Sequence, residues 1–130
     1  MSIELQMLAW SAALGLAQVF LAAAFVTRQR GLAWNAGPRD VVKPPPTGVA
    51  GRLARASNNF LETFPFFAAA VLAVVAADAA DARTALGVQL YFWARLVYVP
   101  LYAAGIPYVR SLAWAVSIFG LLMVLNRLSL

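Results

Sequence analysis

Polar side chains in the second long apolar stretch of this sequence recur at a spacing that would place them together on a helix. They stand at intervals of three, four and three residues: Arg52, Arg55, Asn59 and Glu62. Residues three and four apart lie on one face of an α-helix. Glu62 would lie about 16 Å into the span, too deep for its carboxylate to reach water. This face is therefore expected to line a protein interior or a cavity.

A similar stripe occurs in the third apolar stretch, at intervals of four, three and four residues: Tyr91, Arg95, Tyr98 and Tyr102. Arg95 lies about 14 Å from the end of its stretch, so its depth is close to that of Glu62 measured from the same membrane surface. An unpaired charge is costly in a medium of low dielectric constant. We therefore hypothesise that Glu62 and Arg95 form an ion pair, within one subunit or between two.

Several polar residues are expected to converge on one end of these helices. They are Arg52, Arg55, Asn59, Tyr98, Tyr102 and Arg110. Together they offer guanidinium groups, an amide and two phenols, and Arg is the natural partner of a carboxylate. The pattern indicates a cavity for a small polar anion, open to the cytoplasm. The alternative, in which these groups only hold the helices together, explains the pair of Glu62 and Arg95 but not the convergence.

Several classes of chemistry are excluded because the sequence contains neither Cys nor His. The protein can form no disulfide, no Cys or His metal site, no thiol nucleophile and no Ser-His catalytic pair. A metal ion would have to rely on five scattered carboxylates, so no metal site is expected. Any thiol that takes part in a reaction must be brought in by another molecule.

The elements that position these residues are membrane-spanning helices. The chain is 63% hydrophobic and 12% charged, whereas a soluble domain has roughly half its residues apolar and a quarter charged. A spanning helix needs about 20 mostly apolar residues, and four segments qualify: 3–27, 51–77, 82–104 and 108–125. The sequence therefore predicts one all-α domain, residues 1–130, built as an integral membrane bundle of four transmembrane helices.

The connections and the charges predict how this bundle lies in the membrane. Residues 28–50 include three consecutive prolines and are expected to be extended, whereas the other two connections are short. Lys and Arg concentrate in the first connection and its flanks, and the basic side of a membrane protein is normally cytoplasmic. We therefore expect a multi-pass protein of a bacterial inner membrane with both termini outside the cytoplasm. The net charge of +5 is attributed to topology and lipid headgroups, and no nucleic-acid partner is expected.

Residues 52–65, RLARASNNFLETFP, resemble the second-helix signature of the MAPEG family, the membrane-associated proteins in eicosanoid and glutathione metabolism. The pattern is Arg55 followed by Ala, then Asn59, Glu62 and Pro65. In the third helix, the set Arg95, Tyr98 and Tyr102 resembles the leukotriene C synthase branch. At the start of the fourth, Arg110-Ser111 resembles the Arg-Ser pair of the prostaglandin E synthase branch. The layout of four spans with a long first loop is also similar to that of the family.

This resemblance implies a homotrimer of four-helix bundles that binds glutathione as a co-substrate in a cleft between adjacent subunits. It assigns the glutathione contacts of one subunit to Arg55, Asn59 and Glu62, with Arg52 beside them. Those of the neighbouring subunit would be Arg95, Tyr98 and Tyr102. Arg110 resembles the catalytic Arg that stabilises the glutathione thiolate, and a lipophilic substrate would enter from the bilayer. The implied activity is that of a transferase or peroxidase acting on lipophilic electrophiles.

Two departures from the family and two other functions stay open. Thr63 stands where the leukotriene branch has a Tyr, and the spacing from Tyr102 to Arg110 falls between those of the two branches, so the register of Arg110 is unsettled. One alternative is a non-catalytic, lipid-binding or scaffold protein of the same fold. Another is a small multidrug transporter, but that class relies on a carboxylate within the first helix, where this chain has only Glu4 near the outer end.

Overall fold

The computed structural model describes residues 1–128, and helices make up almost all of its regular structure. The long helices are α1 (Ile3–Arg30), α3 (Gly48–Ala76), α4 (Ala82–Ala103) and α5 (Pro107–Asn126), and α2 (Leu32–Ala36) is short. No strand occurs within the described residues. The predicted all-α class is confirmed, and the four long helices begin and end within a few residues of the predicted segments.

The boundaries of the long helices follow from local sequence signals. Ser2 caps α1 by accepting a hydrogen bond from the backbone N–H of Leu5 at 3.3 Å. Gly31 ends α1 with φ at 97°, a conformation that a side chain would disfavour. Pro107 opens α5, where its missing N–H costs nothing because the first N–H groups of a helix have no partner within it. The sequence is thus locally consistent with the helices that form.

The connection between α1 and α3 differs in one part from the prediction. Residues 28–50 were expected to be extended throughout, but α1 continues to Arg30, α2 forms one further helical turn, and α3 already begins at Gly48. The expectation was wrong for these residues because the three prolines at 44–46 restrict the backbone only near themselves. Residues 38–47 contain no helix, as their composition predicts.

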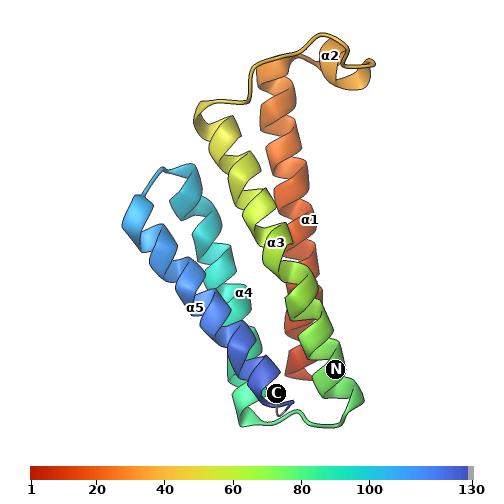
Figure 1. Ribbon diagram of the computed structural model, residues 1–130, viewed down its shortest axis with the longest axis vertical. Helices are drawn as coiled ribbons and strands as arrows, with labels where there is room; N and C mark the ends of the chain where they lie inside the picture. Colours follow the sequence, from red (N-terminus) through yellow and green to blue (C-terminus); the bar gives the residue numbers. More distant parts are fainter. Residues whose placement is uncertain (129–130) are drawn as a thin grey trace.

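Three of the described helices are long and apolar enough to cross a membrane: α1, α3 and α5. Helix α4 is also long, at 22 residues, but it carries Gln89, Arg95 and three tyrosines and does not reach the same level of hydropathy. It lies side by side with α5 (Figure 1). The protein is therefore an all-helical membrane protein in which α4 packs along the strongly apolar α5.

The long helices form two antiparallel pairs, α1 with α3 and α4 with α5 (Figure 1). The two pairs meet at the end of the molecule where α1 begins and α5 ends, and they diverge towards the opposite end (Figure 1). The main hydrophobic core fills the region where they meet, and there Phe67 stacks on Tyr91 with ring centroids 3.9 Å apart. Only a small second cluster, formed by Ala56, Tyr98 and Ala113, packs between the diverging ends, and polar side chains face each other there as well.

Helices α4 and α5 approach closely at a pair of glycines. A Cβ atom added to Gly120 would lie 2.5 Å from the carbonyl oxygen of Gly87, and one added to Gly87 would lie 2.7 Å from that of Gly120. Any side chain at either position would therefore push the helices apart. Small residues allow this kind of backbone contact between membrane helices, and here they fix α4 and α5 as one unit.

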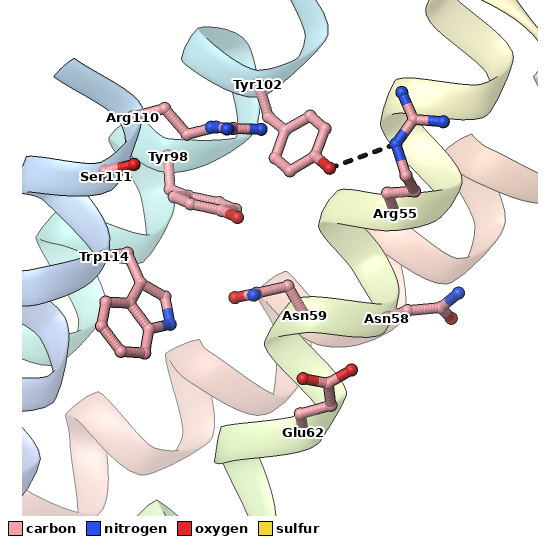
Figure 2. Close-up of a pocket in the computed structure, with 9 residues that line it drawn as sticks. All are labelled: Arg55, Asn58, Asn59, Glu62, Tyr98, Tyr102, Arg110, Ser111 and Trp114. Carbon is pink, nitrogen blue, oxygen red and sulfur yellow. Dashed lines mark hydrogen bonds between the residues drawn. The ribbon is translucent and has the colours of Figure 1, made fainter. Parts of the chain in front are cut away.

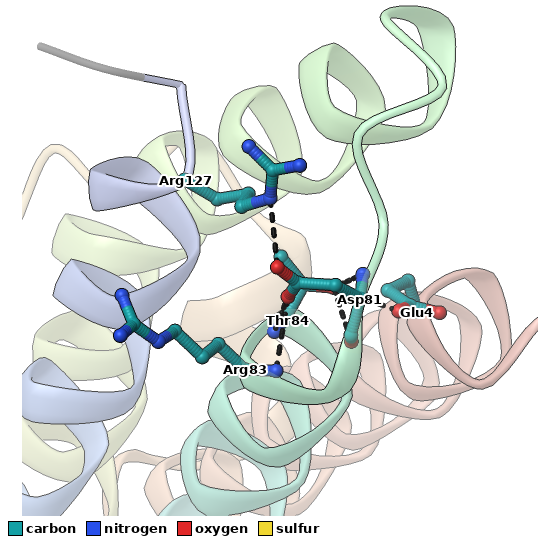
Figure 3. A network of polar contacts seen from close by, with 5 residues as sticks. All are labelled: Glu4, Asp81, Arg83, Thr84 and Arg127. Atoms are coloured by element: carbon teal, nitrogen blue, oxygen red, sulfur yellow. Dashed lines mark hydrogen bonds and ion pairs between the residues drawn. The ribbon is translucent and has the colours of Figure 1, made fainter.

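A network of polar contacts, here called the closed end, joins the helices near the termini (Figure 3). Asp81 caps α4 by accepting hydrogen bonds from the backbone N–H groups of Arg83 and Thr84, and it pairs with the Nε of Arg127 at 2.8 Å. The Thr84 hydroxyl donates to the carboxylate of Glu4 at 2.9 Å, and both residues are buried. The network therefore links α1, the start of α4 and the end of α5.

Candidate functional site

A polar cleft of about 500 Å³ lies between α3 and the α4–α5 pair, at the end where the helix pairs diverge (Figure 2). Nine side chains line it: Arg55, Asn58, Asn59, Glu62, Tyr98, Tyr102, Arg110, Ser111 and Trp114. Helix α3 supplies the first four, α4 the two tyrosines and α5 the last three. We call this region the open end. The convergence of polar residues that the sequence predicts therefore occurs within a single chain.

Tyr102 lies between the two cations of the cleft. Arg55 donates a hydrogen bond from Nε to the Tyr102 hydroxyl at 3.2 Å, and the Arg110 guanidinium lies 4.5 Å from the centre of the same ring. The tyrosine thus connects α3 with α4 and α5 across the cleft (Figure 2). Both guanidinium groups keep further N–H donors that Tyr102 does not use, so each remains able to bind an anion.

Arg95 is not on the wall of the cleft, although it was predicted to contact the ligand. Its side chain is fully buried, and its Nη1 donates to Oδ1 of Asn59 at 2.8 Å. Its guanidinium also stacks over the ring of Tyr98, 4.4 Å from the centroid. Because Arg95 engages the Asn59 oxygen, the amide N–H groups are the donors that Asn59 can still offer to a ligand. Arg95 therefore supports two residues of the cleft from behind.

The hypothesised ion pair between Glu62 and Arg95 is absent from the described part of a single chain. Glu62 is exposed and lines the cleft, and the partner of Arg95 is Asn59. The sequence predicts similar depths for the two residues, but depth alone does not fix the direction of a side chain. Pairing between two chains stays a hypothesis. In one chain, the Glu62 carboxylate is available to a cationic group of a ligand.

Arg52 has a structural contact in place of the predicted position in the site. Its Nε donates to the carbonyl oxygen of Ala103 at 2.8 Å. Ala103 is the last residue of α4, where carbonyl groups lack partners within the helix. Arg52 therefore fastens the start of α3 to the end of α4 beside the cleft. The sequence places Arg52 on the same helix face as Arg55 but does not reveal this acceptor.

Three residues of the cleft were missed as site residues: Asn58, Ser111 and Trp114. A spacing signal is present for Asn58 and Trp114. Asn58 lies four residues before Glu62, and Trp114 lies four residues after Arg110, which is one helical turn in each case. Ser111 was noticed only as the neighbour of Arg110. Tryptophans are common near membrane surfaces, and this general tendency does not decide the direction in which the Trp114 ring points.

Thr63, which departs from the family pattern, does not line the cleft. Its hydroxyl lies 3.0 Å from the hydroxyl of Tyr91, whose ring is buried in the core. The departure therefore removes a large side chain from the core side of α3 and leaves the polar face of that helix intact. Arg110, in contrast, does reach the cleft, which resolves its register within this chain.

The cleft combines two guanidinium groups, one carboxylate, two side-chain amides, two phenols and a hydroxyl. Such a set suits a zwitterionic ligand that carries more than one anionic group. Between residues 1 and 128, no cluster of three or more potential metal ligands occurs. The side chains of the cleft include no thiol, so a thiol nucleophile would have to come from a bound molecule.

Comparison with known proteins gives one clear result. The family model described as the MAPEG family matches residues 7–129, nearly the whole chain. Neither the curated proteins nor the solved structures gave a match. The match covers every helix that contributes to the cleft, and it confirms the resemblance inferred from residues 52–65.

Proposed function

This chain belongs to the MAPEG family, and on that premise we propose that it is a glutathione-dependent membrane transferase. It would join the glutathione thiolate to lipophilic electrophiles. The observation that carries this proposal is the cleft, whose charged groups complement those of glutathione. Glutathione has two carboxylates and one ammonium group, and the cleft has two guanidinium groups and one carboxylate.

The ammonium group, the peptide backbone, the thiol and one carboxylate of glutathione each have a partner in this assignment, and the second carboxylate has none among the nine residues of the cleft. Arg55 binds a carboxylate, for which the planar guanidinium is well shaped. Glu62 accepts the ammonium group, and the amides of Asn58 and Asn59 bond to the peptide backbone of the ligand. Arg110 then faces the thiol end. Tyr102 keeps the two guanidinium groups apart, so that they bind two different groups of the same molecule.

The chemistry needs no His or Cys from the protein. A guanidinium beside the glutathione sulfur stabilises the thiolate relative to the thiol, and the thiolate is the nucleophile. Its lone pair forms the new carbon–sulfur bond. The electrophile either expels its leaving group with the bonding electrons, or takes up a proton from water after addition to a double bond. Arg110 acts by fixed electrostatic stabilisation, and the lipophilic substrate approaches from the bilayer past Trp114.

Peroxide reduction by the same thiolate is a variant of this proposal, since the same site would serve it. A non-catalytic lipid-binding role is favoured by one separate feature. A groove of about 410 Å³ runs between α4 and α5. Apart from Gln89 its lining is apolar, and Trp93, Val97 and Leu112 lie along it. A transporter mechanism gains no support, because Glu4 lies in the first turn of α1 and bonds to Thr84.

The homotrimer stays a proposal taken from the family. The resemblance divides the glutathione contacts between two subunits, whereas one chain brings both groups of residues to the same place. A trimer is therefore not needed to assemble the cleft, but a neighbour would change its outer boundary. Chemical cross-linking in native membranes, followed by mass measurement, tests the subunit number.

The decisive experiment is glutathione binding to the detergent-purified protein by calorimetry, together with the ultraviolet absorbance of the thiolate. We expect saturable binding and a thiolate signal at neutral pH. S-methylglutathione, which has no ionisable thiol, should bind without that signal. The Arg55→Gln variant should bind more weakly, and Arg127→Gln at the closed end should bind normally. No binding at millimolar glutathione by folded protein would favour the lipid-binding role.

A further inference from the structure

The connection between α1 and α3 folds back onto the end of α1 and is held there by side chains. Gln29 donates from Nε2 to the carbonyl oxygen of Thr47 at 3.2 Å, and the Thr47 N–H donates to Gln29 Oε1 at 2.9 Å. Arg30 donates from Nη2 to the carbonyl oxygen of Pro44 at 3.0 Å. These contacts join residues 14 to 18 positions apart, so the connection has a defined shape.

A cavity of about 350 Å³ forms under this folded segment. We call it the basic cradle, and six residues line it: Gln29, Arg30, Lys43, Pro44, Pro45 and Thr47. Two of them are cations and none is an acid. In the part of the chain that the structure describes, Nε of Arg30 has no hydrogen-bond partner. The cradle thus presents positive charge that its own residues leave uncompensated, whereas the unpartnered Nε of Arg30 is itself buried.

The position of the cradle corresponds to the headgroup layer of a membrane. Helix α1 has 28 residues, a length of about 42 Å, which is roughly the thickness of a bilayer with its headgroups. Gln29 and Arg30 are the last two residues of α1. The cradle therefore lies where the phosphates of the lipids are expected, and it lies apart from the cleft.

The segment beside the cradle has the features of a membrane-surface anchor. Trp34 of α2 stacks with the guanidinium of Arg30, 5.0 Å from its ring centroid, and its indole N–H donates to the carbonyl oxygen of Val41. Leu32 is 72% exposed and Val42 is 91% exposed. Aromatic rings with a polar edge favour the interface, and exposed aliphatic side chains next to cations favour the acyl boundary.

We infer that the basic cradle binds the phosphate of an anionic phospholipid headgroup. Arg30 is held in place by Pro44 and Trp34, so it supplies a fixed donor, and Lys43 supplies a second, mobile cation. The apolar side chains of Leu32 and Val42 favour a lipid over a soluble phosphate, because they give the acyl chains a surface to follow. This site does not depend on glutathione binding in the cleft.

The test is lipid binding to the full chain in detergent, measured by native mass spectrometry. The probes are dioleoylphosphatidylglycerol, which is anionic, and dioleoylphosphatidylcholine, which is not. Lys43→Gln should lower the preference for the anionic lipid about fivefold. The matched control is Arg28→Gln, which removes one positive charge from the same region but lies outside the cradle. If the cradle is a specific site, this control should lower the preference clearly less than Lys43→Gln does, because Arg28 does not line the cavity.

The double variant R30Q/K43Q should abolish most of the preference, and its thermal unfolding midpoint shows whether it folds. If the double variant does not fold, the comparison of Lys43→Gln with Arg28→Gln decides whether the cradle is a specific site. Equal losses in Lys43→Gln and Arg28→Gln would mean diffuse attraction and would overturn the site. Full displacement of the anionic lipid by millimolar inorganic phosphate would also overturn the lipid assignment, and would identify a site for free phosphate instead.

Discussion

The closed end and the open end of this bundle both contain charged side chains, but these side chains have opposite roles at the two ends. At the closed end, Asp81 forms an ion pair with Arg127 and accepts hydrogen bonds from the first turn of α4. Glu4 accepts a hydrogen bond from the Thr84 hydroxyl. At the open end, Arg110 faces an aromatic ring and Glu62 faces the cleft.

The difference distinguishes structural polar groups from groups that are available to a ligand. A buried polar group is stable when its partners come from the protein itself. Where the partners are lacking in the chain and the site is hollow, a ligand of opposite charge can supply them. The closed end is therefore expected to control stability and the open end to control binding, and the following variants test this separation.

The largest expected effect is the loss of turnover in Arg110→Ala. We expect the kcat for conjugation of glutathione to chlorodinitrobenzene to fall about 100-fold, because one fixed electrostatic stabiliser is removed. The unfolding midpoint should stay unchanged. Arg127→Ala is the matched control, since it removes the same type of side chain from the closed end, and its kcat should equal that of the parent. A kcat of Arg110→Ala equal to that of the parent would show that Arg110 takes no part in the mechanism.

Thr84→Val should lower the stability of the protein and leave its function at the cleft unchanged, the opposite of what we expect for Arg110→Ala. It leaves the buried carboxylate of Glu4 without its donor, which is expected to lower the free energy of unfolding by about 2 kcal/mol. Glutathione binding should be unchanged, because the cleft lies at the other end. Thr84→Ser retains the hydroxyl and should restore most of the stability. A folded Thr84→Val protein that no longer binds glutathione would show that the two ends are coupled.

Glu62→Gln sharpens the comparison within the open end. We expect the Kd for glutathione to rise about tenfold, which corresponds to the loss of one charged hydrogen bond. Stability should change by less than about 0.5 kcal/mol, because Glu62 is exposed and such positions tolerate substitution. Calorimetry and thermal unfolding measure the two quantities. A large loss of stability with unaltered binding would instead favour an ion pair with Arg95 between chains.

The smallest effect is a pH dependence of the closed end. Hydrogen bonds from the backbone of Thr84 and Arg83, together with the charge of Arg127, hold the pKa of Asp81 below its ordinary value of 3.8. A lowered folded-state pKa adds stability that is fully present above the unfolded-state value and is lost as the pH falls through the folded-state value. The unfolding midpoint of the parent should therefore exceed that of Asp81→Asn at pH 6. The two should approach each other below pH 4, and a constant difference would contradict this role.

Much of the fold could be predicted because two features constrain the chain. The thickness of the bilayer sets the length of the spanning helices, and prolines and glycines mark where helices end. The helix α2 was missed because five residues carry too little periodicity to identify one turn. The close contact at Gly87 and Gly120 was also not predicted, since a glycine in a membrane helix does not say which neighbour it faces.

The residues of the cleft were predicted in part, and the errors have a common cause. Arg55, Asn59 and Glu62 share a helix face, and all three line the cleft. Arg95 shares a face with Tyr98 and Tyr102, yet its side chain is directed into the interior. There it donates a hydrogen bond to Asn59 and stacks on the ring of Tyr98. A helix face covers an arc wide enough to touch both a neighbouring helix and a cavity, so spacing does not separate these two surroundings.

The sequence by itself therefore determined which residues lie on one helix face and at similar depth, because the helical rise and repeat are fixed by backbone geometry. It also determined the family, through the local pattern from Arg55 to Pro65. Only the tertiary structure decided which polar groups pair with each other and which face the cleft. That depends on where the helix pairs meet and where they diverge, and no single segment of the chain encodes it.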